Sequence, residues 1–185
     1  MADVLRQTQI GGVCLVVVLV LLAVSGCAVP PAQPLIPPYL FLTSYTNPVY
    51  LWSISYPSGW AIDSKDPSFV RIGAPVEGAL CCIHSRAVRF KTVDEFTDFM
   101  LGENERFFRG RGQAFVILKR QRISVPNDVI GNDVLVEIGP GGKSRRIFIL
   151  ADGRGLIVDC ETYIKNWERL EAGYGIIISS FTLGK

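Results

Sequence analysis

Two of the five cysteines, Cys81 and Cys82, lie beside a histidine near the middle of this chain. Cys82 and His84 are two residues apart, and His84 is the only histidine of the sequence. A thiol with a nearby imidazole could act as a nucleophile and its base, as in a Cys/His-dependent hydrolase. In a strand, however, residues two positions apart lie roughly 7 Å apart on one face, too far for direct proton transfer unless long side chains turn inward. An ordinary strand histidine is the competing interpretation.

The cysteines also allow a disulfide or a zinc site. Cys81 and Cys82 are adjacent, so in a strand they point to opposite faces and at most one can reach Cys160 from the same side. A disulfide from Cys160 to Cys81 or to Cys82 is therefore one hypothesis, with the partner left open. Zinc could use Cys81, Cys82 and Cys160 with His84, but adjacent cysteines splay apart and no CxxC motif is present. We expect no metal and no other cofactor.

The acidic and basic segments outside this region are weaker indicators of a binding site. Asp128, Asn132 and Asp133 offer oxygen ligands that calcium prefers, but their spacing fits no calcium loop and is typical of turns. A group of basic residues is expected to form a solvated sheet face that could also attract anions: Lys119, Arg120, Arg122, Lys143, Arg145 and Arg146. The net charge of +2 predicts no nucleic-acid partner.

The amino terminus predicts export and lipid attachment. An uncharged apolar run covers residues 11–24, which suits the core of a signal peptide better than a membrane span of roughly 20 residues. The following Val24-Ser25-Gly26-Cys27 resembles the bacterial lipobox, in which the cysteine receives a lipid. We therefore predict a signal peptide at 1–26 and lipidation, including palmitate, at Cys27. An uncleaved membrane helix is the alternative.

A proline-rich segment follows the predicted cleavage site. Five prolines lie within residues 30–38, a density that favours an extended spacer. We assign residues 27–48 to a tether and residues 49–185 to one folded domain. The protein is then expected in the cell envelope, held to a membrane by its lipid and facing outside the cytoplasm, in the periplasm or at the cell surface. Such a compartment permits a disulfide.

The remaining pattern predicts strands and two helices. Thr92 and Glu95 form a capping box before an apolar stripe, which indicates a helix over 92–108. Steps of three and four indicate a second helix over 167–181. Alternating or β-branched segments with turn residues between them predict strands at 52–56, 69–72, 79–88, 114–125, 133–138, 144–150 and 156–160. The fold class is α+β, with a single antiparallel β-sheet and helices packed against it.

Two short motifs within this order resemble a known family. "YPSGW" contains Tyr56, Pro57, Gly59 and Trp60, and "IIISSF" ends the closing helix. Both are similar to motifs of the PsbP-like superfamily, which includes the extrinsic PsbP protein of photosystem II and bacterial lipoproteins, DcrB-like ones among them. The resemblance implies an α/β/α sandwich in which these residues form a structural turn. It implies no catalytic residue, and no photosystem site maps onto this chain.

Together these features favour a non-catalytic binding protein. The leading hypothesis is a lipid-anchored extracytoplasmic accessory or assembly factor that binds a protein or envelope partner. The first alternative is an enzyme that uses Cys82 and His84. The second alternative is a carrier of a small molecule or a metal.

Overall fold

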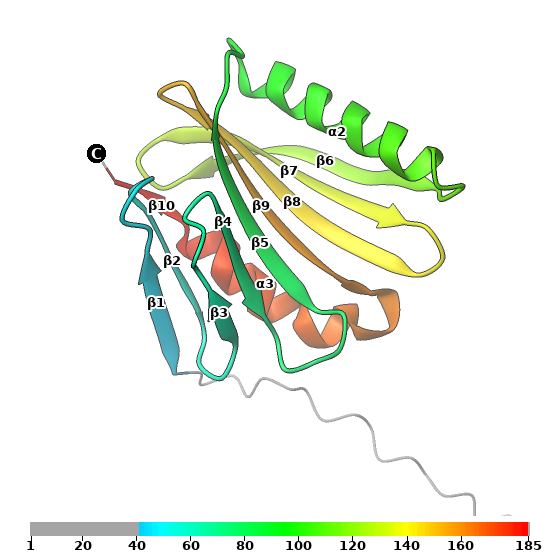
Figure 1. Ribbon diagram of the computed structural model, residues 1–185, viewed down its shortest axis with the longest axis horizontal. Helices are drawn as coiled ribbons and strands as arrows, with labels where there is room; N and C mark the ends of the chain where they lie inside the picture. The colour runs from blue at the N-terminus through cyan, green and yellow to red at the C-terminus, as the bar shows by residue number, and fades with distance from the viewer. Residues whose placement is uncertain (1–40, 185) are drawn as a thin grey trace, which may run out of the picture. The chain divides into compact units, whose positions relative to one another are not determined.

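The computed structural model describes residues 41–184, which form two antiparallel sheets and two α-helices (Figure 1). The small sheet has the order β1-β2-β10, and its strands are Leu42–Thr46, Trp52–Pro57 and Thr182–Leu183. The large sheet has the order β3-β4-β5-β9-β8-β7-β6. In chain order, the strands of the large sheet are β3 (Ala61–Asp63), β4 (Phe69–Gly73), β5 (Leu80–Ala87), β6 (Phe115–Val125), β7 (Val129–Ile138), β8 (Gly142–Ala151) and β9 (Arg154–Tyr163).

The α+β class predicted from the sequence is confirmed, with two corrections to the detail. The prediction of a single sheet was wrong, because β1, β2 and β10 form a second one. The strand β1 also falls inside the predicted tether, residues 27–48, so the folded part begins before residue 49. The predicted signal peptide, Cys27 and residues 27–40 of the tether lie outside the described residues.

Three tight turns join β6 to β9 into a meander. Asn127 and Asp128 have φ angles of 70° and 59° between β6 and β7, and Asp152 and Gly153 have 50° and 70° between β8 and β9. Asn, Asp and Gly tolerate positive φ better than other residues, and paired positive φ angles match the twist of a hairpin. The short connections make each of these neighbours antiparallel.

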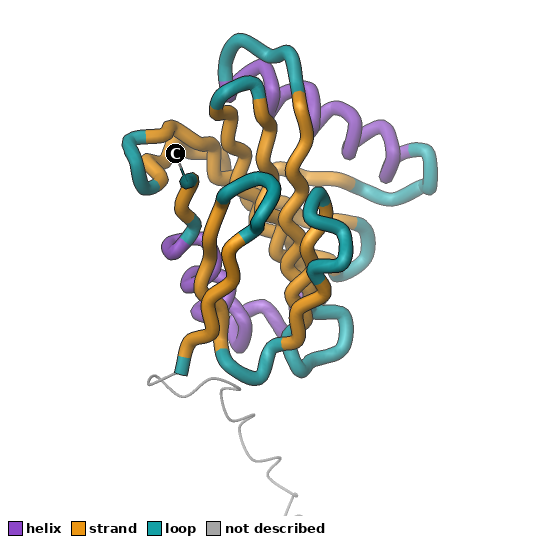
Figure 2. The backbone as a smooth tube through the Cα atoms, turned by 60° about the vertical axis from the view of Figure 1, so that its left-hand side comes forward, coloured by secondary structure: helices purple, strands orange, loops and turns teal. Residues whose placement is uncertain are grey.

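The two helices cover opposite faces of the large sheet. Helix α3 (Trp167–Ser180) follows a short 3-10 turn, η1 (Ile164–Asn166), and packs in the main core with β2 and β9. Helix α2 (Val93–Arg109) packs on β6, β7 and β8 around Phe96 and Phe148. Figure 2 shows the strands of the large sheet between the two helices. Neither helix of residues 41–184 is long and apolar enough to cross a membrane.

A reciprocal cap fixes the start of α2. The Glu95 backbone N–H donates to Thr92 Oγ1 at 3.1 Å, and the Lys91 backbone N–H donates to Glu95 Oε2 at 2.9 Å. The capping box thus satisfies two backbone donors at the helix start. The helix begins at Val93, one residue after the sequence-based boundary.

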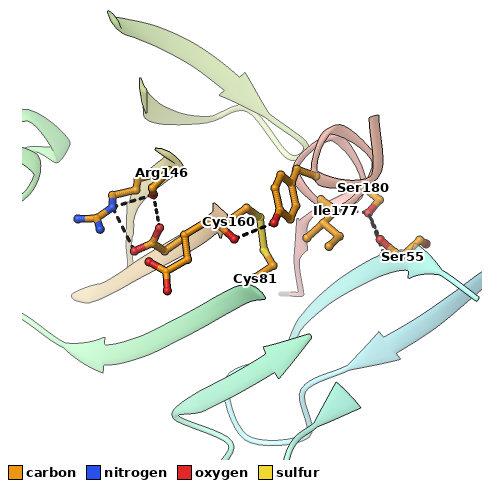
Figure 3. The surroundings of a disulfide bond; sticks show 10 residues. Ser55, Cys81, Arg146, Cys160, Ile177 and Ser180 are labelled. Atoms are coloured by element: carbon orange, nitrogen blue, oxygen red, sulfur yellow. Dashed lines mark hydrogen bonds and ion pairs between the residues drawn. A yellow bond between two sulfur atoms is a disulfide. The ribbon is translucent and has the colours of Figure 1, made fainter. Parts of the chain in front are cut away.

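A disulfide joins Cys81 of β5 to Cys160 of β9. The two cysteines are directly opposite each other in the register, and both lie fully buried in the main core beside α3. Close by, the Tyr174 hydroxyl of α3 donates to the Glu161 carbonyl at 2.7 Å (Figure 3). Of the two pairings that the sequence left open, the structure contains Cys81 with Cys160, and Cys82 is a buried free cysteine.

The "YPSGW" motif forms the turn between β2 and β3. Gly59 has a φ of 90°, a conformation that glycine adopts without the strain of a side chain. The Trp60 N–H donates to the Pro57 carbonyl at 3.1 Å, while Tyr56 and Trp60 are buried. Trp60 meets Tyr174 edge to face, with ring centroids 5.8 Å apart. The motif therefore pins the small sheet to helix α3.

The strand β6 forms one edge of the large sheet and is irregular. Its register against β7 shifts between Ile117 and Lys119, so one extra residue bulges from the strand. Val116, Ile117 and Leu118 at this bulge are each nearly half exposed.

Replacing Trp60 by alanine tests the turn. Because the ring is buried against Tyr174, Trp60→Ala should lower the free energy of unfolding by about 3–5 kcal/mol, measured by urea denaturation. The exposed Phe107 is the control, and Phe107→Ala should cost less than about 1 kcal/mol. A loss for Trp60→Ala as small as that of the control would contradict the packing of this turn.

The disulfide gives a second stability prediction. It joins cysteines 79 residues apart, so removing it frees a long loop in the unfolded chain. The double variant Cys81→Ala/Cys160→Ala should lose about 2–4 kcal/mol of unfolding free energy, whereas Cys82→Ala should lose about 1 kcal/mol. Equal stability of the double variant and the wild type would rule out a stabilising cross-link.

Candidate functional site

Polar side chains gather on the face of the large sheet that carries α2, beside the helix. The register places Asp159 of β9 between Cys82 of β5 and Arg146 of β8. Because side chains alternate along each strand, His84 and Ser144 share this face with them. Three neighbouring strands thus bring a thiol, an imidazole, a hydroxyl, a carboxylate and a guanidinium to one surface.

A closed triangle of polar contacts holds Arg146 in place. Its Nε lies 3.1 Å from Asp159 Oδ2 and donates to Ser144 Oγ, also at 3.1 Å. The Ser144 hydroxyl in turn donates to Asp159 Oδ1 at 2.5 Å (Figure 3). The Arg146 side chain is only 5% exposed, and the Asp159 side chain only 17%. Burial of both charges costs hydration, which the pairing and the hydroxyl offset.

The far end of the Arg146 guanidinium has no such partners. Within residues 41–184, its two Nη atoms form no hydrogen bond, and the guanidinium carbon lies 5.7 Å from the centre of the Phe115 ring. Arg146 lines a cavity of about 140 Å³ between α2 and the sheet. The other polar lining residues are His84, Arg86, Asn104 and Asp159, and the apolar ones are Met100, Phe148 and Ile157.

His84 forms part of the cavity wall and is half-buried. Its ring lies on Phe69 of β4, with centroids 4.5 Å apart. Burial lowers the pKa of His84 below its ordinary value of 6.5; the nearby Asp159 opposes this shift, and the charges of Arg86, Arg146 and Arg71 reinforce it. The imidazole is therefore neutral at pH 7, able to donate one hydrogen bond and accept another.

Cys82 does not have the properties of an activated nucleophile. Burial raises the pKa of its thiol to about 12, and the carboxylates of Asp159 and Glu161 add to the rise while Arg71 opposes it. The reactive form of cysteine is the thiolate, so at neutral pH very little of Cys82 is reactive. The site can hold a ligand by hydrogen bonds and charge, but it does not activate this sulfur.

The residues considered as metal ligands do not converge. Within residues 41–184, no three side chains of the types His, Cys, Asp and Glu are placed to hold a metal ion. Cys81 and Cys160 are bonded to each other. In the acidic segment, Asn132 donates to Asp94 of α2, whereas Asp133 accepts two hydrogen bonds from Arg145 on the opposite face of the sheet.

The basic residues that we expected on one sheet face are also divided between the two faces of the large sheet. Arg120 and Arg122 of β6 form ion pairs with Asp94 of α2, and Arg120 also pairs with Asp98. Arg145 pairs with Asp133 on the other face, and Arg146 is buried. The six basic residues therefore do not form a single solvated patch, because they alternate between faces and all four arginines among them have carboxylate partners.

Sequence analysis missed Ser144, Asp159 and the separate role of Arg146. Alternation within "KSRRIF" does place Ser144 and Arg146 on one face of a strand, which was the available signal. Asp159 joins them only through the register of β8 with β9, which pairs it with Arg146.

Comparison with known proteins gives a likeness of fold. No protein-family model matches the sequence, and no curated protein matches it either. Among solved structures, cyanobacterial PsbP (CyanoP) from Synechocystis sp. PCC 6803 is similar with a TM-score of 0.63 and 12% identity, over 79% of this chain and 94% of that one. A protein of unknown function, PA94 from Pseudomonas aeruginosa, described as a putative regulator, has a TM-score of 0.46 and 17% identity over 72% of this chain and 91% of that one. The order of strands and helices in residues 41–184 is thus that of a PsbP-like fold.

Proposed function

We propose that this protein is a lipid-anchored extracytoplasmic binding protein without catalytic activity, which serves as an accessory or assembly factor for a protein or envelope partner. Its lipid is attached at the Cys27 thiol, and residues 1–26 are then removed. The membrane is reached through this anchor, and the PsbP-like domain faces the periplasm or the cell surface.

The disulfide between Cys81 and Cys160 is the observation that carries this proposal. Disulfides persist in exported proteins and are rare in the cytoplasm, where thiols are kept reduced. The bond lies in the main core between adjacent strands, so it is part of the domain structure rather than an exposed reactive pair. A structural disulfide supports export, and export is what the lipobox-like Val24-Ser25-Gly26-Cys27 predicts.

The polar face supports a binding role over catalysis. The Cys82 thiol, the nucleophile of the alternative hydrolase hypothesis, is buried and has a pKa of about 12. The buried Arg146 is held rigidly by Asp159 and Ser144, which suits the recognition of a ligand at low entropic cost. A rigid polar site with a small cavity fits a binding protein.

The first test is the intact mass of protein extracted from membranes of a bacterial host. The wild type should have the mass of residues 27–185 plus a diacylglyceryl group, with or without an amide-linked acyl chain. Cys27→Ala should lack the lipid and should not be cut before residue 27, because the modified cysteine is what the lipoprotein peptidase requires. A full-length, unmodified wild-type mass would overturn the lipid anchor and favour an uncleaved amino-terminal helix.

Thiol labelling tests the claim that Cys82 is not a nucleophile. At pH 7 iodoacetamide should label the folded protein at least about tenfold more slowly than the unfolded chain, because the thiolate fraction is small and the sulfur is buried. The rate should stay low up to about pH 9 and rise only near the raised pKa. Fast labelling of Cys82 at neutral pH would instead favour the Cys/His enzyme.

A further inference from the structure

The two Nη atoms of Arg146 have no hydrogen-bond partner among residues 41–184 and form a recognition edge for a ligand. Asp159 and Ser144 occupy Nε, which fixes the plane of the guanidinium and leaves its terminal N–H groups without these partners, and the Arg146 side chain lines the cavity. A guanidinium donates most strongly to planar anions in a two-pronged geometry. The free edge of Arg146 therefore matches the two oxygens of a carboxylate.

A second arginine lies at the same cavity. Arg86 of β5 lines it and directs Nη2 onto the Met100 sulfur of α2, which is a weak acceptor. An anionic oxygen in the cavity would be a better partner for that donor. With His84 neutral, the lining carries two positive charges and one negative charge, and the negative one is engaged by Arg146. This balance favours an anion over a cation.

The rest of the cavity limits the size and polarity of the ligand. Met100, Phe148 and Ile157 supply an apolar wall, and the volume of about 140 Å³ is suited to a few carbon atoms. A fully charged phosphate would have to leave water beside this wall and near the Asp159 carboxylate. A short organic acid places its apolar chain on the wall and its carboxylate on the arginine.

We propose that the cavity between α2 and the sheet binds a small organic carboxylate, held by the Nη atoms of Arg146 with Arg86 at its side. The proposal deepens the binding role stated above and rests on it, because it names the ligand class of the same polar face. Asn104 on α2 and His84 on β5 also line the cavity and supply polar groups beside it.

The test uses butyrate and the full chain purified from membranes in a deuterated nonionic detergent. Line broadening of the butyrate methyl signal is followed by NMR, at constant ionic strength with chloride as the replaced anion. Butyrate should bind with a dissociation constant below about 10 mM, while the neutral butyramide should bind at least about tenfold more weakly. No binding of butyrate, or equal binding of butyramide, would overturn the proposal.

Three variants locate the site. Arg146→Lys keeps the charge beside Asp159 but loses the fork, and should weaken butyrate binding about tenfold or more. Arg86→Gln changes an exposed residue at the cavity and should weaken binding about threefold to fivefold. Arg89→Gln removes a nearby exposed arginine outside the cavity and should leave binding unchanged. Equal losses from Arg86→Gln and Arg89→Gln would mean that only the general positive charge attracts butyrate.

Further probes and a mass measurement separate the remaining outcomes. Inorganic phosphate binding more tightly than butyrate would overturn the choice of carboxylate. If the acetylated dipeptide Ala-Val with a free carboxyl end binds more tightly than butyrate, the natural ligand is the carboxyl end of a peptide chain. Tighter binding of butyrate indicates a free organic acid.

The lipid mass is measured on the same sample. A lipidated protein that does not bind butyrate therefore refutes the ligand inference alone. An unlipidated protein that binds butyrate refutes the anchor alone.

Discussion

The large sheet has two faces to cover, and the chain supplies one α-helix for each. Helix α3 and the small sheet bury one face with a continuous apolar core that includes the disulfide. Helix α2 has 17 residues and covers mainly β6, β7 and β8 on the other face. The strands β5 and β9 are left beside the helix, so their outward residues on this face are free to be polar. The position of α2 thus determines that the polar site lies over β5 and β9, beside the helix.

The central strand β9 links the two sides of this arrangement. Its alternate residues Val158 and Cys160 belong to the main core, whereas Asp159 points to the polar face. A substitution at Val158 or Cys160 therefore affects the main core, whereas one at Asp159 or Ile157 affects the face beneath α2, where Ile157 belongs to the second apolar cluster. The triangle of Asp159, Ser144 and Arg146 is costly in desolvation, because it places two charges in a setting where only one edge of the guanidinium is satisfied by the protein.

Periodicity and turn chemistry predicted most of the large sheet and both helices. The capping box at Thr92 and the turn residues Asn127 and Asp152 act locally, so the sequence contains their physical cause. The strand β1 was missed because it is short and largely exposed and follows a proline-rich stretch. β10 is a two-residue strand defined by its pairing with β2. Such strands depend on tertiary contacts that no local pattern records.

The site was less accessible to sequence analysis than the fold. Cys81 and Cys82 were equal candidates for Cys160, and only the register between β5 and β9 selects Cys81. The sequence "SRR" on β8 looks like a basic run, but its two arginines point to opposite faces of the sheet. There Arg145 pairs with Asp133 and Arg146 pairs with Asp159. A shift of one residue would exchange these faces, which is why charge alone misrepresented this segment.

The bulge in β6 has a consequence for how the molecules behave at high concentration. An edge strand of 11 residues offers unpaired backbone groups to a neighbouring copy, and the exposed Val116, Ile117 and Leu118 would strengthen such a contact. The register shift falls within this apolar stretch and bends the row of donors and acceptors, while Lys119 adds a charge directly after it. The irregularity thus hinders edge-to-edge pairing of β6 with another copy of the domain.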